Sequence, residues 1–173
     1  MGKHKEKKLK LEPDEEKSDE EMPQEGGAKK QPLPEPTTEK DEYDGLCTNV
    51  NAIAQPLASR KQAKKIYKLI RKSSKIKYQL RQGIVDVQRA LRKQEKGIVI
   101  LAGDVTPVDI YAHIAGICEE AGLPYCYTPS KHDLGLASGH RRPSIMVLIR
   151  PHDDYQDLYK EMHEMIDKMP IPR

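Results

Sequence analysis

A continuous run of five apolar residues, Ile98–Ala102, constrains the fold of this chain more than any other segment. The run is rich in β-branched residues and lacks the polar and apolar alternation of a strand that has one solvent-exposed face. Such a strand is buried on both faces, so other elements must cover its sheet on both sides. Residues 124–128 and 144–149 have the same character. The sequence therefore predicts a small sheet enclosed between two layers of helices.

Segments with helical periodicity separate these apolar stretches. Apolar side chains recur on one helical face at Ala63, Ile66 and Ile70, after the candidate N-cap Ser59. We expect Asp104 to cap a later helix. The further helices are expected at residues 83–93, 108–121, 130–135 and 152–169, with a short extended segment at residues 80–83. This order predicts an α/β fold, a three-layer α-β-α sandwich around a small mixed four-stranded sheet.

The composition divides the chain into a tail and a domain. Residues 1–45 carry 9 Lys or Arg against 14 Asp or Glu, with few large apolar side chains. Such a segment cannot bury enough apolar surface to offset chain entropy. We therefore expect residues 1–45 to form a disordered charged tail and residues 46–173 to form the folded domain. The lysine-rich residues 3–10 are typical both of nuclear import signals and of solvated tails.

Residue types argue against several classes of function. No apolar run approaches the length of a membrane span, and the 3 cysteines include no C-x-x-C pair. Cys118, inside an expected helix, and Cys126, inside an expected strand, are interpreted as buried thiols rather than nucleophiles. The acids after His152 are more typical of a helix start than of a metal site. We therefore expect no catalytic residue, metal, cofactor, small-molecule substrate or membrane contact.

Positive charge is concentrated in one part of the chain. Residues 60–97 hold 14 Lys or Arg against only 2 acidic residues. A field of one sign raises the rate of encounter with polyanions and points to a phosphate-rich partner. Lys64 and Lys68, on the outer side of the expected first helix, are candidate RNA contacts.

A turn led by glycine follows this basic helix. Gly83 should expose the N-terminus of the next helix, where free backbone N–H groups can meet a phosphate. Arg81, Asp86 and Arg89 flank that point, and an acid and an arginine on one face can bond to guanine edges. We expect the basic helix and this turn to form a single RNA-binding surface.

Residues 81–89 resemble a variant of the G-x-N-E-x-x-K element of the kink-turn-binding ribosomal-protein family of archaea and eukaryotes. Three further blocks agree in order and spacing: Leu101–Asp104 before Pro107, Cys118–Glu120 with Leu123–Tyr125, and Ser130–Gly135 leading to Arg142 and Pro143. The segments Ile53–Ser59, Lys96–Ile98 and Arg150–Gln156 are most similar to the eukaryotic H/ACA ribonucleoprotein branch of that family. The resemblance implies an α-β-α sandwich that grips RNA at the start of its second helix and by the loop before its last strand.

The resemblance also implies individual contacts. Gly83 keeps the family glycine, Asp86 stands for a family Glu, and Arg89 stands for a family Lys. The positions that contact the kink-turn or its looped-out base in relatives are Ile110, Lys131, Arg142 and Ile145. Val85 replaces the Asn that helps to read tandem G·A pairs, and it has no hydrogen-bonding group. We therefore expect RNA binding with weak kink-turn specificity.

The function implied by the resemblance is that of a non-catalytic RNA-binding subunit of the box H/ACA small nucleolar ribonucleoprotein. That particle carries out guide-RNA-directed pseudouridylation of ribosomal RNA and supports ribosome biogenesis. The implied partners are H/ACA guide RNA, the pseudouridine synthase subunit and the small adaptor subunit. The implied location is the nucleus and nucleolus, with association with telomerase RNA in animals.

Two alternatives stay open. One is a kink-turn-specific ribosomal or spliceosomal protein of the same family, against which Val85 argues. The other is a regulatory protein-interaction module of the same fold that binds no RNA.

Overall fold

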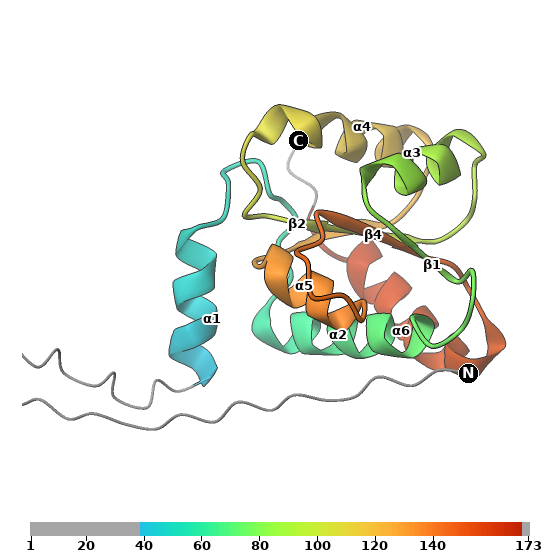
Figure 1. Ribbon diagram of the computed structural model, residues 1–173, viewed down its shortest axis with the longest axis horizontal. Coiled ribbons are helices and arrows are strands. Elements are labelled where there is room, and N and C mark those ends of the chain that lie inside the picture. The colour runs from blue at the N-terminus through green and yellow to red at the C-terminus, as the bar shows by residue number, and fades with distance from the viewer. Residues whose placement is uncertain (1–38, 171–173) are drawn as a thin grey trace, which may run out of the picture. The chain divides into compact units, whose positions relative to one another are not determined.

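The computed structural model describes residues 39–170 (Figure 1). In chain order the elements are α1 (Glu39–Thr48), α2 (Arg60–Ser73), β1 (Leu80–Gln82), α3 (Ile84–Arg92), β2 (Ile98–Ala102), the 3₁₀ turn η1 (Val108–Ile110), α4 (Ala112–Glu120), β3 (Tyr125–Thr128), α5 (Lys131–Ala137), β4 (Met146–Ile149), the 3₁₀ turn η2 (Asp153–Tyr155) and α6 (Gln156–Asp167).

The four strands form one mixed sheet in the order β1-β4-β2-β3. Strand β2 pairs in parallel with β3 and antiparallel with β4, which in turn pairs antiparallel with β1. Ile100, at the centre of β2, pairs with Cys126 of β3 and with Val147 of β4. Every residue of β2, β3 and β4 is buried, as their unbroken apolar character predicts.

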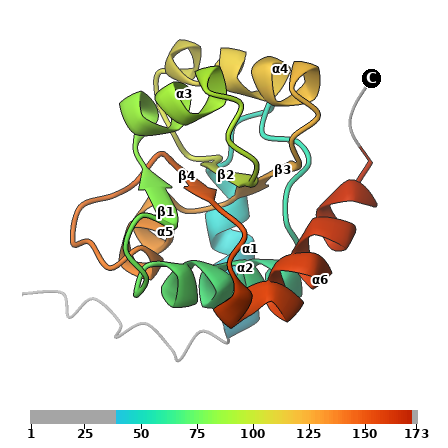
Figure 2. The same ribbon diagram turned by 90° about the vertical axis from the view of Figure 1, so that its right-hand side faces the viewer.

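Helices cover both faces of the sheet. Helices α3 and α4 lie on one face, and α2, α5 and α6 lie on the other, as the two perpendicular views show (Figures 1 and 2). Fully buried aliphatic side chains from both layers, including Ile66 and Leu69 of α2, Val87 of α3 and Ile114 of α4, meet the sheet. The expected three-layer α-β-α sandwich around a mixed four-stranded sheet is confirmed.

The helices begin largely where their local signals place them. Ser59 caps α2, and its amide donates to the side-chain oxygen of Gln62 at 2.7 Å. Ser130 caps α5 by accepting from the amide of Asp133 at 3.2 Å. These two caps fix where α2 and α5 begin.

The expected helix over residues 108–121 is wrong over its first four residues. Residues 108–110 form a 3₁₀ turn, and Tyr111, with φ −129° and ψ −4°, separates it from α4. The ring of Tyr111 is fully buried, and its hydroxyl accepts from Asn51 at 2.9 Å, so tertiary packing overrides helical continuity here. Asp104 does not cap this segment; its Oδ1 accepts from the amide of Lys131 instead.

Helix α1 extends into residues that were expected to belong to the tail. Residues 39–45 are helical, and the Tyr43 hydroxyl donates to the carbonyl oxygen of Ala58. Tyr43, Leu46 and Cys47 recur at helical spacing, and Tyr43 packs against the core. This packing explains the helix. The disorder expected for residues 1–38 falls outside the described residues, and none of the described helices is long and apolar enough to cross a membrane.

Candidate RNA interface

Strand direction gathers four loops at one end of the sheet. Because β1 and β2 both run antiparallel to β4, and β3 is parallel to β2, the carboxyl ends of β1, β2 and β3 lie beside the amino end of β4. The loops there, taken with the first residues of the helices that follow them, are residues 83–86, 103–110, 129–131 and 139–145, which we call the loop end. The parts of the chain that flank strands at this end are thereby brought together from distant positions in the sequence.

Backbone hydrogen bonds interlock these loops. The Gly83 amide donates to the Met146 carbonyl at 3.0 Å, and the Ala102 amide donates to the Ile145 carbonyl at 2.8 Å. The Ser144 amide donates to the carbonyl of Lys131 at 3.0 Å. Because each loop is held by a neighbour, the loop end is a preorganised surface rather than a set of independent segments.

Gly83 makes the turn from β1 into α3. Its φ of 85° and ψ of 163° lie in a region that is accessible almost only to glycine. An added Cβ would meet no atom within 4 Å, so the constraint is conformational rather than steric. The turn leaves the first amides of α3 open toward solvent at the loop end, where an anion can bind them.

Gly135 allows the loop before β4 to approach α5 closely. A Cβ at Gly135 would overlap the carbonyl oxygen of Arg142 and press on Pro143. The missing side chain therefore lets Arg142 and Pro143 pack against α5, and the exposed Arg142 lies across a groove from β1.

Ion pairs orient two of the predicted contacts. Glu95 lies 3.7 Å from the Nε atoms of both Arg81 and Arg150, and its side chain is only 18% exposed. Asp86 lies 3.4 Å from Arg89, three residues further along α3, and both are more than half exposed. Arg81 is less exposed than Arg89, so solvent screens its ion pair less.

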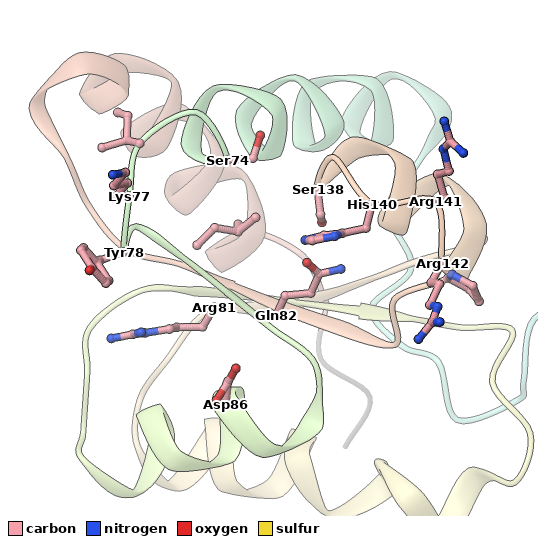
Figure 3. A pocket seen from close by; sticks show the side chains of 13 residues that line it. Ser74, Lys77, Tyr78, Arg81, Gln82, Asp86, Ser138, His140, Arg141 and Arg142 are labelled. Carbon is pink, nitrogen blue, oxygen red and sulfur yellow. The ribbon is translucent and has the colours of Figure 1, made fainter. Parts of the chain in front are cut away.

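A cationic groove of about 750 Å³ opens between the β1 strand and the loop that precedes β4 (Figure 3). Its lining residues are Ser74, Ile76, Lys77, Tyr78, Leu80, Arg81, Gln82, Asp86, Ser138, His140, Arg141, Arg142 and Pro143. It joins three of the predicted residues, Arg81, Asp86 and Arg142, in one concave surface.

Eight of the ten predicted site residues lie at the loop end or beside it. Gly83, Lys131, Arg142, Ile145 and Ile110 belong to the loop end, where Ile110 is 39% exposed. Asp86, which also belongs to the loop end, lines a common small pocket with Arg81 and Arg89, which border the loop end.

Lys64 and Lys68 lie elsewhere. They are exposed on α2, which packs on the face of the sheet opposite to α3 (Figure 2). The structure therefore does not bring them together with the glycine turn.

Sequence reasoning missed Lys77, Tyr78 and Arg141. Lys77 belongs to the basic stretch and could have been selected, but nothing local to Tyr78 or Arg141 indicates that β1 and the loop before β4 lie side by side. Only the strand order places them in one groove.

The thiols are unsuited to nucleophilic chemistry. Burial raises the pKa of Cys118 and of Cys126 to about 12, so both stay protonated near neutral pH. No group of three or more potential metal ligands occurs among residues 39–170.

Comparisons with known proteins agree with this geometry. The model of the ribosomal protein L7Ae/L30e/S12e/Gadd45 family matches residues 64–159. A solved structure titled Giardia lamblia 15.5kD RNA binding protein superposes with a TM-score of 0.65 at 24% identity, covering 68% of this chain and 98% of that one. At that identity the likeness concerns the fold alone.

Three curated relatives are much more similar. An H/ACA ribonucleoprotein complex subunit 2-like protein of Caenorhabditis elegans is 58% identical, over 79% of this chain and 83% of its own length. The H/ACA ribonucleoprotein complex subunit 2 of Drosophila melanogaster is 52% identical, over 78% and 84%. The subunit 2-like protein of Xenopus laevis is 47% identical, over 79% and 91%.

The resemblance found in the sequence motifs is thereby confirmed. The chain belongs to the ribosomal protein L7Ae/L30e/S12e/Gadd45 family, as a relative of the proteins named H/ACA ribonucleoprotein complex subunit 2.

Proposed function

We propose that this chain is a non-catalytic RNA-binding subunit of the box H/ACA small nucleolar ribonucleoprotein, supporting guide-RNA-directed pseudouridylation of ribosomal RNA and ribosome biogenesis. The observation that carries the proposal is the high identity, 47–58%, to proteins of that name along most of their length. The proposed location is the nucleus and nucleolus, where such a particle works.

The loop end supplies a physical route to RNA binding. Gly83 presents open α3 amides to a phosphate, while Lys131 and Arg142 approach from neighbouring loops. Ile110 and Ile145 offer apolar surface for an unstacked base. Lys64 and Lys68, on the other layer, form a separate cationic face that attracts RNA without reading its sequence.

The role of the chain in this proposal is to position RNA. The pseudouridine synthase subunit would carry the reaction, and the small adaptor subunit would join that subunit to this chain. Holding the upper stem of the guide RNA fixes its orientation, so that the target uridine docks at the synthase. A rigid loop end suits this role, because a fixed contact loses less free energy to ordering on binding.

Co-purification tests the assignment to the particle. The tagged chain should recover box H/ACA RNAs and the synthase subunit, with telomerase RNA sought in the same pool where the host is an animal. Recovery of ribosomal or spliceosomal RNA without box H/ACA RNA would contradict the proposal and favour the alternative family function.

Reconstitution tests the non-catalytic role. The purified chain alone should form no pseudouridine in a target RNA, and adding it to the synthase, adaptor and guide RNA should raise the rate. A rate that does not change on addition would argue against the positioning role.

A further inference from the structure

The groove described above continues past the loop end along the outer side of β1. Lys77 and Tyr78 lie at one end of it, Arg141 and Arg142 lie at the other, and Arg81, Gln82 and His140 lie between (Figure 3). Strand β1 is one of the two edge strands of the sheet and pairs with β4 alone among the described strands. This side of the molecule is therefore an accessible concave surface that adjoins the proposed RNA interface.

Tyr78 is the least buried large apolar side chain in the described part of the chain. Its side chain is 75% exposed, so it contributes almost nothing to the core. Its φ of 67° lies in the left-handed region, which an L-residue other than Asn or Asp occupies at a cost of about 1–2 kcal/mol. Stability of the free protein gives no reason for a tyrosine here, where glycine or asparagine would be less strained.

The charges in the groove favour a polyanion. Arg81 and Asp86 each have an opposite charge within 4 Å, Glu95 and Arg89 respectively. Lys77, Arg141 and Arg142 are exposed, and no ion pair to them occurs among residues 39–170. A groove with an accessible aromatic ring and Lys77 at one end, and Arg141 and Arg142 at the other, matches the way proteins bind single-stranded nucleic acid, with phosphates on the cations and a base on the ring.

We propose that this groove binds unpaired RNA nucleotides that extend from the helical RNA held at the loop end, with one base stacked on Tyr78, its neighbouring phosphate on Lys77 and phosphates further along the strand on Arg141 and Arg142. The proposal rests on the proposed function and adds to it a single-stranded element that the bound RNA must carry. Sequence preference should be weak, because every base offers a face for stacking.

An acidic peptide is the competing occupant, and the geometry favours it less. Strand β1 has only three residues, so a peptide strand added to that edge would gain few backbone hydrogen bonds. A carboxylate side chain would use the cations but not the flat, exposed ring of Tyr78.

Equilibrium binding to hairpin RNAs that share one stem tests the inference. One hairpin is blunt, one carries a short unpaired 5′ tail and one an unpaired 3′ tail. The full chain should bind one of the tailed hairpins about fivefold or more tighter than the blunt one, as a single stacked base would give. Tyr78→Asn should abolish that gain and leave blunt-hairpin affinity unchanged, whereas Tyr78→Phe should keep the gain.

These variants separate stacking from folding. Asparagine tolerates the left-handed backbone better than tyrosine, so Tyr78→Asn should fold at least as stably as the unaltered chain. Lys77→Ala should reduce the slope of the logarithm of the binding constant against the logarithm of salt concentration by roughly 0.7 for the tailed hairpin. That value corresponds to the loss of one phosphate contact on a single strand. Lys160→Ala, an exposed lysine of α6, is the matched control and should change nothing.

The outcomes distinguish the two proposals. If neither tail improves binding, or if the improvement survives Tyr78→Asn, the inference is overturned while RNA binding at the loop end stands. If a glutamate-rich peptide binds in a Tyr78-dependent manner and the tails do not, the groove is a protein site and the inference is overturned. If the chain binds no hairpin in a salt-dependent manner, the proposed function fails first, and this inference fails with it.

Discussion

The backbone amide of Lys131 donates a 2.8 Å hydrogen bond to Oδ1 of Asp104, and the Lys131 side chain reaches back to the Asp104 carbonyl at 3.3 Å. Lys131 is the first residue of α5, and Asp104 lies in the loop after β2. One acid thus satisfies an open amide at the start of α5 and fixes two loops of the proposed RNA interface to each other.

Replacing Asp104 with Ala should lower the free energy of unfolding by about 1–3 kcal/mol, because it removes a charge-assisted hydrogen bond at a helix start. Chemical denaturation measures this loss. The control is Asp109→Ala, which removes an exposed acid of η1 and should change stability little. Equal effects of the two substitutions would contradict the role assigned to Asp104.

Gly83→Ala should reduce both stability and RNA affinity. Its backbone conformation costs an L-residue about 1–3 kcal/mol, and relief of that strain would rotate the first amides of α3 away from a bound phosphate. Gly116→Ala is the matched control, since Gly116 is an exposed residue of α4 with no atom within 4 Å of an added Cβ. That change should leave stability equal or higher by about 0.5–1 kcal/mol. Thermal unfolding of Gly83→Ala and Gly116→Ala measures the expected changes in stability, and RNA titration of the same variants measures the expected change in affinity.

Val85→Asn should increase discrimination between a kink-turn and a mutated kink-turn by about 1–3 kcal/mol, because it restores a hydrogen-bonding group for a base edge. Val85 is 66% exposed, so the substitution should leave the fold intact. Val85→Ala serves as the control and should show the weak discrimination expected of the unaltered chain. Strong discrimination by the unaltered chain would instead favour a kink-turn-specific protein.

The free energy of unfolding should fall as the pH rises from about 9 toward 12. Burial raises the pKa of Cys126 from its ordinary 9.0 to about 12, so in that window the unfolded chain has lost a proton that the folded chain keeps. The unfolded state then binds fewer protons, and the slope of stability against pH is negative. Cys126→Ala should make this slope shallower. Its smaller side chain also lowers the free energy of unfolding, but by an amount that does not depend on pH and so leaves the slope unaffected. Urea denaturation across the window measures both slopes, and identical slopes would contradict the account.

Local sequence signals predicted the sheet and most helix starts. The limits of β2 follow from an apolar run that only a doubly covered strand explains, and α3 begins immediately after Gly83, as expected from the turn chemistry of glycine. These features depend on neighbours in the sequence, and therefore the sequence alone can place them.

The errors arose where distant residues decide the local structure. Tyr111 interrupts a helical pattern because its hydroxyl and ring are fixed inside the fold, and Asp104 bonds to a residue 27 positions away. Periodicity showed that Lys64 and Lys68 face outward, but it could not show that α2 and α3 lie on opposite faces of the sheet. That placement depends on strand order, which also creates the groove beside Tyr78.

The most direct test of RNA binding at the loop end is the salt-dependent affinity of the folded chain for the upper stem of a box H/ACA guide RNA. The account predicts that Lys131→Glu with Arg142→Glu lowers affinity more than tenfold and flattens the logarithmic salt slope by roughly 2, while Lys64→Glu with Lys68→Glu has a smaller effect. If the first double variant kept the affinity and salt slope of the unaltered chain, RNA would not be held at the loop end.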